Sequence, residues 1–197
     1  KQTYGIDARV IAYGGDQALE GGGGEHALTV DLPDRFTLAL CRIEPENNVE
    51  MILEAFSEAS MPLVFVGNWN NSEFGRELKA RFAEQPNLHL LDPIYDPAEL
   101  FALRSKAVAY VHGHSVGGTN PSLVEMMHFG IPVLAFDCVF NRHTTDNEAS
   151  YFADATSLTV LVEDLASQQN GDEMRRIANE KYRWETIGEH YFALLAE

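Results

Sequence analysis

The chain has 197 residues, 45% of them hydrophobic, and a formal net charge of −16 at pH 7. This length and composition are ordinary for a globular protein with one sizeable core. The strong acidity argues against nucleic acid or an anionic membrane surface as a partner, because phosphates would be repelled. No apolar run reaches the roughly 18 residues that a membrane span needs, and the first residues do not resemble a secretory signal.

Short apolar runs of strand length recur along the first three quarters of the chain. They alternate with segments of helical period, as in Val49, Ile52, Leu53 and Phe56, which are spaced i, i+3, i+4, i+7. This alternation predicts βαβ units, and the nearly continuous apolar strands are typical of a parallel sheet covered on both faces. The predicted strands are 10–13, 36–41, 63–66, 88–91, 108–111 and 133–136.

Further helices are predicted around Leu78 and Phe82, from Asp96-Pro97 onward, and over 121–129. From about Ser157 the pattern becomes wholly helical. The sequence therefore predicts an α/β fold, a Rossmann-like doubly wound parallel sheet with helices at the C-terminus.

Several local features of the chain carry smaller expectations. Asp172 is a plausible N-cap, and Trp184 lies on the apolar face of the last helix, where we expect it in the core. Residues 21–24 are four glycines, which are typical of a flexible surface loop. Cys41 and Cys138 lie in apolar runs, so we expect buried thiols rather than a disulfide, as in a reducing compartment.

The most informative stretch runs from His112 to Glu125. Its order is strand, glycine-bearing loop and helix start, and the free N–H groups and dipole of such a start favour phosphate. Gly117 and Gly118 allow a ligand to approach the backbone closely, and Pro121 suits the first helical position. Glu125 follows one turn later, where its carboxylate can accept hydrogen bonds from ribose hydroxyls. The stretch predicts a site for a nucleotide or nucleotide-sugar.

Polar and glycine residues follow the end of each predicted strand. In an open α/β sheet, ligands bind beyond the carboxyl ends of the strands, so these residues are expected at one edge. They are Gly14–Asp16, Arg42–Asn48, Gly67–Trp69, Asp92–Tyr95, His112–His114, and Asp137 with Asn141 and Arg142.

Arg42 is the sharpest single candidate of this group. It ends an apolar strand, where a cation is costly without an anionic partner, and a diphosphate is a partner that arginine grips bidentately. The structural alternative is an ion pair with Glu44 or Glu46. Arg142 is a candidate second phosphate contact, with a salt bridge in its own loop as the alternative.

Three aromatic side chains have open assignments. His112 and His114 are candidates for contact with the sugar of a bound nucleotide-sugar or are structural imidazoles, and no third ligand beside them indicates a metal site. Trp69 either stacks on a base or lines a loop.

With these residues in view, the chain resembles the C-terminal, nucleotide-sugar-binding domain of GT-B glycosyltransferases of the glycosyl transferase group 1 (GT4-like) family. The segment 7–16 resembles the family's "V-I-P-N-G-V-D", and Leu63–Gly67 its "L-x-I-V-G". Arg42 with Pro45-Glu46-Asn47 resembles "G-R-L…P-E-K-N", and 182–191 resembles the "Y-x-W-E…Y" tail. The stretch 113–125 is closest to bacterial rhamnosyltransferases.

The resemblance implies a role for each matching residue. Arg42 would bind the donor diphosphate, the backbone of 118–122 would cradle it, and Glu125 would bind the ribose. The backbone near Ile94 and Tyr95 would hold the base. Arg42 and Ser115 are the catalytic candidates. The donor-binding candidates are Arg42, Asn47, Ile94, Tyr95, His114, Gly117, Gly118, Thr119, Asn120, Ser122, Glu125 and Arg142.

Two residues depart from the family pattern. Ser115, or His114, stands where the family has its first motif glutamate, which touches the donor sugar. Asn47 stands where the family often has a phosphate-binding lysine, so Arg42 or Arg142 must carry more of the neutralisation.

The resemblance also implies how the molecule is organised. Residues 1–197 would be one donor-binding domain, with 1–16 as a leading strand and 157–197 as a helical tail. The acceptor-binding N-terminal domain would be absent, so this chain alone would bind donor without turnover. The donor would be a nucleotide diphosphate-sugar, such as one carrying rhamnose, and the acceptor a glycan or lipid-linked glycan.

The remaining expectations follow from the same resemblance. No bound metal or other cofactor is expected, because helix dipole and arginine stabilise the leaving diphosphate. The protein would act in polysaccharide biosynthesis in the bacterial cytoplasm, at most peripherally at the inner face of the membrane. The alternatives are a non-catalytic nucleotide-sugar-binding or interaction module, and a nucleotide-sugar 2-epimerase.

Overall fold

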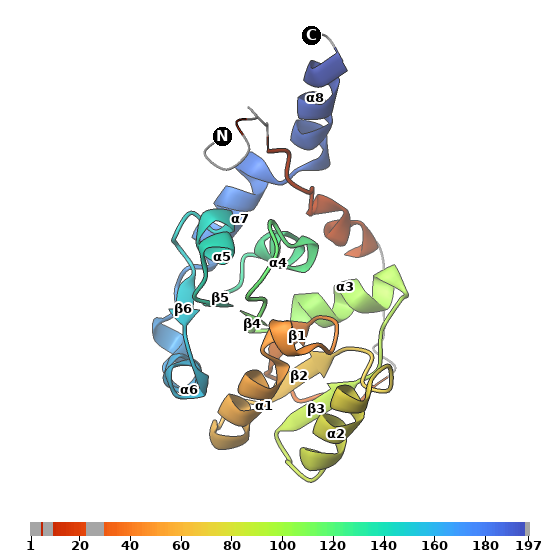
Figure 1. Cartoon of the computed structure of the whole chain (residues 1–197), viewed down its shortest axis with the longest axis vertical. Coiled ribbons are helices and arrows are strands. Elements are labelled where there is room, and N and C mark those ends of the chain that lie inside the picture. The colour runs from red at the N-terminus through yellow and green to blue at the C-terminus, as the bar shows by residue number, and fades with distance from the viewer. Residues whose placement is uncertain (1–4, 6–9, 23–29, 196–197) are drawn as a thin grey trace.

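The computed structural model describes residue 5 and residues 10–22 and 30–195 of the chain. Six parallel strands form a single sheet in the order β3-β2-β1-β4-β5-β6, with helices on both faces (Figure 1). The predicted Rossmann-like, doubly wound α/β fold is thereby confirmed. The strands are β1 Thr37–Leu40, β2 Leu63–Val66, β3 Leu88–Leu91, β4 Ala109–His112, β5 Val133–Phe136 and β6 Ser150–Phe152.

The strand order places a topological switch between β1 and β4. The chain builds outward from β1 to β3 and then returns to the other side of β1, so the loops after β1 and β4 diverge. Ligands of open α/β sheets bind at such a point.

Helices flank the sheet and connect its strands. The helices are α1 Val49–Glu58, α2 Glu73–Arg81, α3 Pro97–Lys106, α4 Pro121–Met127, α5 Val139–Thr144, α6 Ala155–Glu163, α7 Gly171–Lys181 and α8 Trp184–Leu195, and the short 3-10 helices are η1 Asp16–Gly22, η2 Pro45–Asn47 and η3 Leu165–Ser167.

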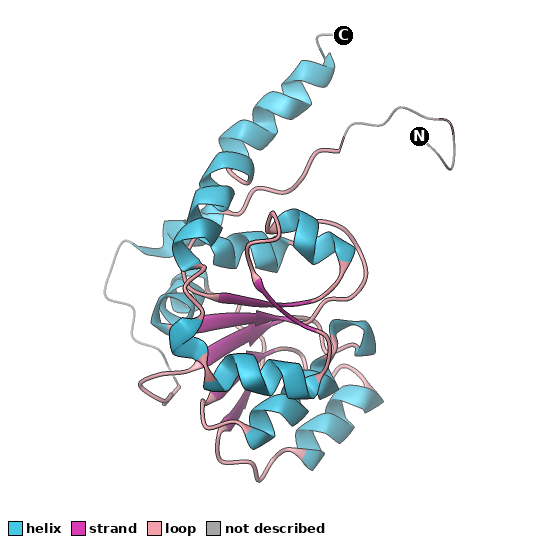
Figure 2. Ribbon diagram, turned by 90° about the vertical axis from the view of Figure 1, so that its left-hand side faces the viewer, coloured by secondary structure: helices cyan, strands magenta, loops and turns pink. Residues whose placement is uncertain are grey.

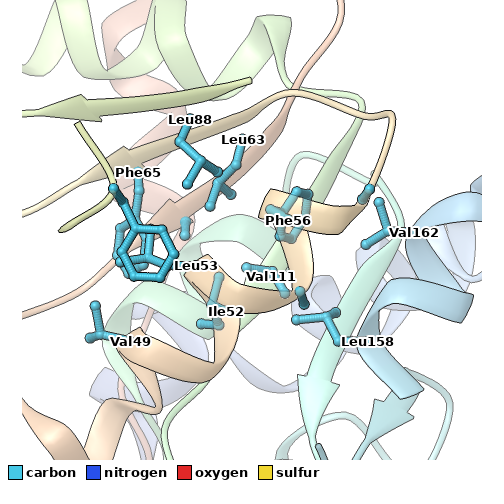
Figure 3. Packing of buried hydrophobic residues seen from close by; sticks show 14 of the residues in the cluster. Val49, Ile52, Leu53, Phe56, Leu63, Phe65, Leu88, Val111, Leu158 and Val162 are labelled. Carbon is cyan, nitrogen blue, oxygen red and sulfur yellow. The ribbon is translucent and has the colours of Figure 1, made fainter. Parts of the chain in front are cut away.

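Two hydrophobic cores lie on opposite faces of the sheet. Successive strand residues point to opposite faces, so Phe65 joins one core and its neighbour Val64 the other. Figure 3 shows the first core, where Phe56 of α1, Val111 of β4 and Leu158 of α6 pack together. The second core holds residues of α3, α4 and α7. Both faces of the sheet are covered by packed side chains, which explains why the strands are almost continuously apolar.

Helix starts follow the residues predicted for them in two places. Pro97 and Pro121 occupy the first turn of α3 and α4, and the side chains of Asp96 and Asn120 cap these helices. The predicted N-cap of α7, Asp172, is wrong by two residues. Asn170 precedes α7, and Asp172 lies inside its first turn, where its charge still favours the helix dipole.

The first predicted strand is wrong, and the last strand of the sheet, β6, was not predicted. Residues 10–13 form no strand; the segment that contains them runs past α8 and α4, and the Gly15 N–H donates to the Tyr182 carbonyl oxygen (2.7 Å). An apolar run of four residues cannot itself reveal whether it pairs with a sheet. Strand β6 was missed because only three residues pair with β5.

The region around α8 departs furthest from expectation. Figures 1 and 2 show α8 projecting away from the sheet. Trp184 at its start is 46% exposed and therefore does not belong to the core.

The four glycines predicted to form a flexible loop are only partly described. Gly21 and Gly22 lie in η1 against Phe101 rather than in a free loop, whereas residues 23 and 24 lie outside the described part of the chain.

Two smaller observations complete the fold. Cys41 and Cys138 are free thiols, each half-buried, and burial raises the pKa of Cys41 to about 12. Of the helices in the described ranges, none combines the length and apolar character needed to cross a membrane.

Candidate functional site

The strand ends of β1, β2 and β3 enclose a cleft of about 390 Å³ at the carboxyl edge of the sheet. Its position agrees with the edge that the strand-end residues predicted. The loop after β4 borders the same region, because Ser115 is hydrogen-bonded to η2. The cleft is lined by Cys41, Arg42, Ile43, Glu44, Val66, Gly67, Asn68, Asn71, Pro93, Ile94 and Tyr95.

Arg42 lies at this cleft with most of its side chain in solvent. The side chain is 76% exposed and its Nη2 is 3.2 Å from an oxygen of Glu44. The structural alternative for Arg42, a pair with Glu44, is thus present. An exposed pair of this kind stabilises the fold by at most about 1 kcal/mol, so an anionic ligand can replace Glu44 as partner at little cost.

Asn47 and Asn48 support the backbone around Arg42. Asn47 is 1% exposed, and its Nδ2 donates to the carbonyl oxygen of Arg42 (2.8 Å). Asn48 adopts a left-handed conformation (φ 50°) before α1, and its Nδ2 donates to the carbonyl oxygen of Gly113 (2.8 Å). Asn47 therefore fixes the Arg42 backbone. Asn48, which the sequence placed at this edge without a role of its own, joins the loops after β1 and β4.

The loop after β4 packs directly on η2. The backbone N–H and the hydroxyl of Ser115 both donate to the carbonyl oxygen of Glu46, at 3.0 and 2.8 Å. A side chain at Gly113 would overlap the carbonyl oxygen of Asn47. The Ser115 hydroxyl is thus engaged in holding the loop.

A directional chain of hydrogen bonds runs through the buried end of β4. Tyr110 donates to Ser122 Oγ (3.1 Å), and Ser122 donates to Asn120 Oδ1 (2.8 Å). Tyr110 Oη is therefore left to accept from His112 Nδ1, 3.2 Å away. This assigns the proton of His112 to Nδ1, and Nε2 is buried without a partner in the described part of the chain.

His114 stacks on His112, with ring centroids 4.4 Å apart and planes 11° from parallel. Burial lowers the pKa of His114 from 6.5 to about 4; the Arg42 cation lowers it further and the Glu46 carboxylate opposes the shift. Burial, followed by the charge of His114, also holds the pKa of His112 well below its ordinary value. Both imidazoles are therefore neutral at pH 7.

The stability of the protein is expected to fall as the pH drops from about 6.5 to about 4. In this window an unfolded His114 is protonated and the folded one is not, so the unfolded state binds more protons and is favoured. The slope is about 1.4 kcal/mol per pH unit for one such group. Urea unfolding at pH 7.0 and 5.0 measures it, and His114→Asn should show a smaller difference between the two pH values. An unchanged difference in the variant would contradict the buried neutral state.

The loop before α4 is open to solvent. Gly117 has φ +120°, and neither Gly117 nor Gly118 has a heavy atom within 4 Å of where a Cβ would lie. Asn120 Oδ1 accepts from the backbone N–H of Ser122 (3.0 Å), which leaves the Asn120 amide NH₂ turned away from this cap. Thr119 is half-buried in the same loop.

Glu125 does not lie free at the head of α4. Its Oε2 pairs with Arg104 Nη2 of α3, and its Oε1 accepts from Gln17 Nε2 of η1 (2.8 Å). The side chains of Arg104 and Glu125 are only 8% and 18% exposed. Sequence reasoning missed both partners, although an arginine directly after Leu103, on the apolar side of a helix, is a signal for a buried ion pair.

Of the remaining predicted side chains, only some line the cleft. Ile94 and Tyr95 border the cleft, and Tyr95 is 84% exposed. Arg142 pairs with both oxygens of Asp137 (2.5 and 2.8 Å) and lies over the ring of Tyr151, 4.1 Å from its centroid. The loop salt bridge considered for Arg142 is therefore present, and it lowers the pKa of Asp137.

Trp69, in the loop after β2, is not placed to stack on a base. Its side chain is fully buried, its ring meets Phe65 edge-on, and its Nε1 donates to the carbonyl oxygen of Leu91 (3.0 Å). It closes the core beneath the cleft. Within the described ranges, no group of three or more His, Cys, Asp or Glu side chains is arranged to hold a metal ion.

Solved structures of glycosyltransferases share this fold. HepE from Anabaena, in complex with UDP and glucose, superposes with a TM-score of 0.70 at 14% identity over 83% of this chain and 48% of its own. Sucrose-phosphate synthase from Thermosynechococcus elongatus gives 0.68 at 20% identity over 94% and 50%. A glycosyltransferase from Rickettsia africae gives 0.74 at 11% identity over 93% and 54%. The chain thus spans about half the length of these proteins.

The sequence itself assigns the family. No curated protein sequence matches the chain. The model of the family described as "Glycosyl transferases group 1" matches residues 26–184, which include the cleft, the loop after β4 and α7. The chain therefore belongs to the glycosyl transferases group 1 family.

Proposed function

We propose that this chain is the donor-binding domain of a glycosyltransferase that moves a sugar from a nucleotide diphosphate-sugar to a glycan acceptor. The observation that carries the proposal is the exposed Arg42 at a cleft where the strands end, beside the topological switch. The similar structures support it, because HepE is in complex with UDP-glucose and pneumococcal GtfA with UDP and GlcNAc.

The chemistry assigned to the site is electrostatic. Arg42 exchanges Glu44 for the diphosphate and stabilises the charge that develops on the leaving group. The backbone N–H groups of Gly118, Thr119 and Asn120 donate to the same phosphates, since Pro121 has no N–H and that of Ser122 is bonded to Asn120 Oδ1. The carboxylate of Glu125 accepts from the ribose hydroxyls. Ile94 and Tyr95 border the end of the cleft assigned to the base. No bound metal takes part in this scheme.

Finer assignments belong to the same proposal. The transferred sugar is a hexose-type sugar such as rhamnose, the subfamily is GT4-like, and the product is a polysaccharide made in the bacterial cytoplasm. A glycan or lipid-linked acceptor binds a second domain, outside residues 1–197. This chain therefore binds donor without turnover.

Arg42→Ala is expected to weaken binding of a nucleoside diphosphate about 10- to 100-fold, because a charge-assisted bidentate contact is lost. Calorimetric titration of the 197-residue chain with dTDP, UDP, GDP and ADP measures the effect and identifies the preferred base. Arg81→Ala removes the same charge from a surface pair with Glu50 and Glu54, away from the cleft. This control should bind like the wild type. Equal binding by Arg42→Ala and the control would remove Arg42 from the site.

A non-catalytic nucleotide-sugar-binding module is the second candidate. It is favoured by Ser115, because the family places an acid there and this hydroxyl is already bonded to the Glu46 carbonyl oxygen. Ser115→Glu, tested for sugar transfer in the enzyme that carries this domain, distinguishes the two candidates. A gain of transfer would identify a degraded site, and a loss would show that the loop works as it stands.

A further inference from the structure

Glu125 is connected to the start of α8 through a single side chain. Gln17 Nε2 donates to Glu125 Oε1 (2.8 Å), and Gln17 Oε1 accepts from Trp184 Nε1 (2.6 Å). Asp16, the preceding residue, accepts from the backbone N–H of Trp184 (2.8 Å). Residues far apart in sequence thus form one continuous path from α8 to the carboxylate.

The chemistry of tryptophan fixes the direction of this path. An indole N–H only donates, so Trp184 must face the amide oxygen of Gln17. The amide NH₂ of Gln17 is then turned toward Glu125. An amide rotated by half a turn would present its oxygen to the carboxylate and lose both hydrogen bonds. Trp184 therefore decides which end of Gln17 meets Glu125.

Close packing keeps these groups together. A Cβ at Gly14 would overlap the indole of Trp184, and a Cβ at Gly15 would lie 2.8 Å from the backbone nitrogen of Glu125. The segment before Gln17 is thereby held between α8 and α4. Arg104, from α3, holds the other carboxylate oxygen. The Glu125 carboxylate is thus held at both oxygens, by Gln17 and by Arg104, so a change of rotamer would break both contacts.

The Glu125 carboxylate can accept further hydrogen bonds from a ligand. Two carboxylate oxygens offer about four acceptor positions, of which Gln17 and Arg104 occupy one on each oxygen. The remaining positions can accept from sugar hydroxyls, of which a ribose offers two. The Arg104 cation also offsets the charge that Glu125 would otherwise present to a diphosphate.

We propose that Gln17 is a positioning residue that aims Glu125 at the ribose hydroxyls, and that Trp184 sets the orientation of Gln17. The seating of α8 is thereby coupled to nucleotide binding. This inference depends on the proposed donor-binding function. It adds two residues, from η1 and α8, that lie outside the cleft and do not touch the nucleotide themselves.

The test measures how much the ribose hydroxyls contribute to affinity. Each protein is titrated with whichever of dTDP, UDP, GDP and ADP binds the wild type most tightly, and with its 2′,3′-dideoxy analogue. The analogue lacks both hydroxyls of a ribonucleotide, or the single 3′-hydroxyl of dTDP. Gln17→Glu keeps the shape of the side chain but sets a second carboxylate against Glu125. We expect it to weaken binding of the hydroxyl-bearing nucleotide about tenfold and binding of the dideoxy analogue less than twofold.

Trp184→Phe is the second variant, chosen because it keeps an aromatic ring on Gly14 and removes only the N–H donor. We expect a loss of about three- to fivefold, again confined to the hydroxyl-bearing nucleotide. Phe192→Ala changes a 73% exposed aromatic residue elsewhere on α8 and should bind both nucleotides like the wild type. Circular dichroism establishes that each variant is folded.

Each outcome has a defined meaning. Losses confined to the hydroxyl-bearing nucleotide in both variants support the inference. Equal losses for both nucleotides, or no loss in Trp184→Phe, overturn it, because a structural role would not distinguish the two ligands. A wild-type chain that binds none of the four nucleoside diphosphates overturns the proposed function instead.

Discussion

Replacing Glu125 with leucine is expected to lower the free energy of unfolding by about 3 kcal/mol, because it leaves a buried cation without its partner. The Arg104 side chain is 8% exposed, and its Nε already has no partner in the described part of the chain. Glu125 supplies the ion-pair partner of its Nη2. Urea unfolding of the wild type and Glu125→Leu at pH 7 measures the difference.

The double variant Arg104→Met/Glu125→Leu separates stability from ligand binding. Exchanging a whole buried pair for apolar residues of similar size is often neutral or stabilising, so most of the lost stability should return. Binding of the nucleoside diphosphate should not return, because the carboxylate assigned to the ribose is absent. A double variant that is as unstable as Glu125→Leu would show that the ion pair is not the cause.

Gly113→Ala is expected to destabilise the protein by about 3 kcal/mol or more. The added Cβ would overlap the carbonyl oxygen of Asn47 and lie 2.7 Å from Cδ1 of Ile52, a fully packed core side chain. Neither neighbour can move cheaply, since one is backbone and the other is enclosed. The denaturant midpoint in urea reports the loss.

Gly118→Ala is the matched control in the same loop. Its Cβ would meet nothing within 4 Å, so the free energy of unfolding should stay within about 0.5 kcal/mol of the wild type. Nucleoside diphosphate binding should nevertheless weaken, because the new methyl group stands where the phosphates approach the backbone. If both alanine variants were equally stable, the close packing of Gly113 on η2 would be wrong.

The fold was predictable from the sequence because its signals are local and repeated. The boundaries of β2, β3 and β5 agree with the apolar runs 63–66, 88–91 and 133–136. Prolines at helix starts act through their own backbone, so α3 and α4 begin where predicted. The strand predicted at 10–13 was wrong because this segment lies beside α8 rather than beside another strand. No local pattern reveals such a distant partner.

The candidate site was predictable only in part. Arg42 and the loop after β4 were placed at the sheet edge by topology, and the structure has them there. The partners of Glu125 were not predictable, because Gln17 and Arg104 lie 108 and 21 residues away in sequence. A buried ion pair depends on which helices pack together, and no local pattern in a single sequence indicates that packing.

The two tryptophans of the chain lie in opposite surroundings. Trp69 is fully buried against Phe65, whereas Trp184 is 46% exposed with its indole N–H bonded to Gln17. Their fluorescence is therefore expected to divide into a blue, quencher-protected component from Trp69 and a red, iodide-accessible component from Trp184. The molecule carries its own pair of optical reporters, one for the integrity of the sheet and one for the seating of its last helix.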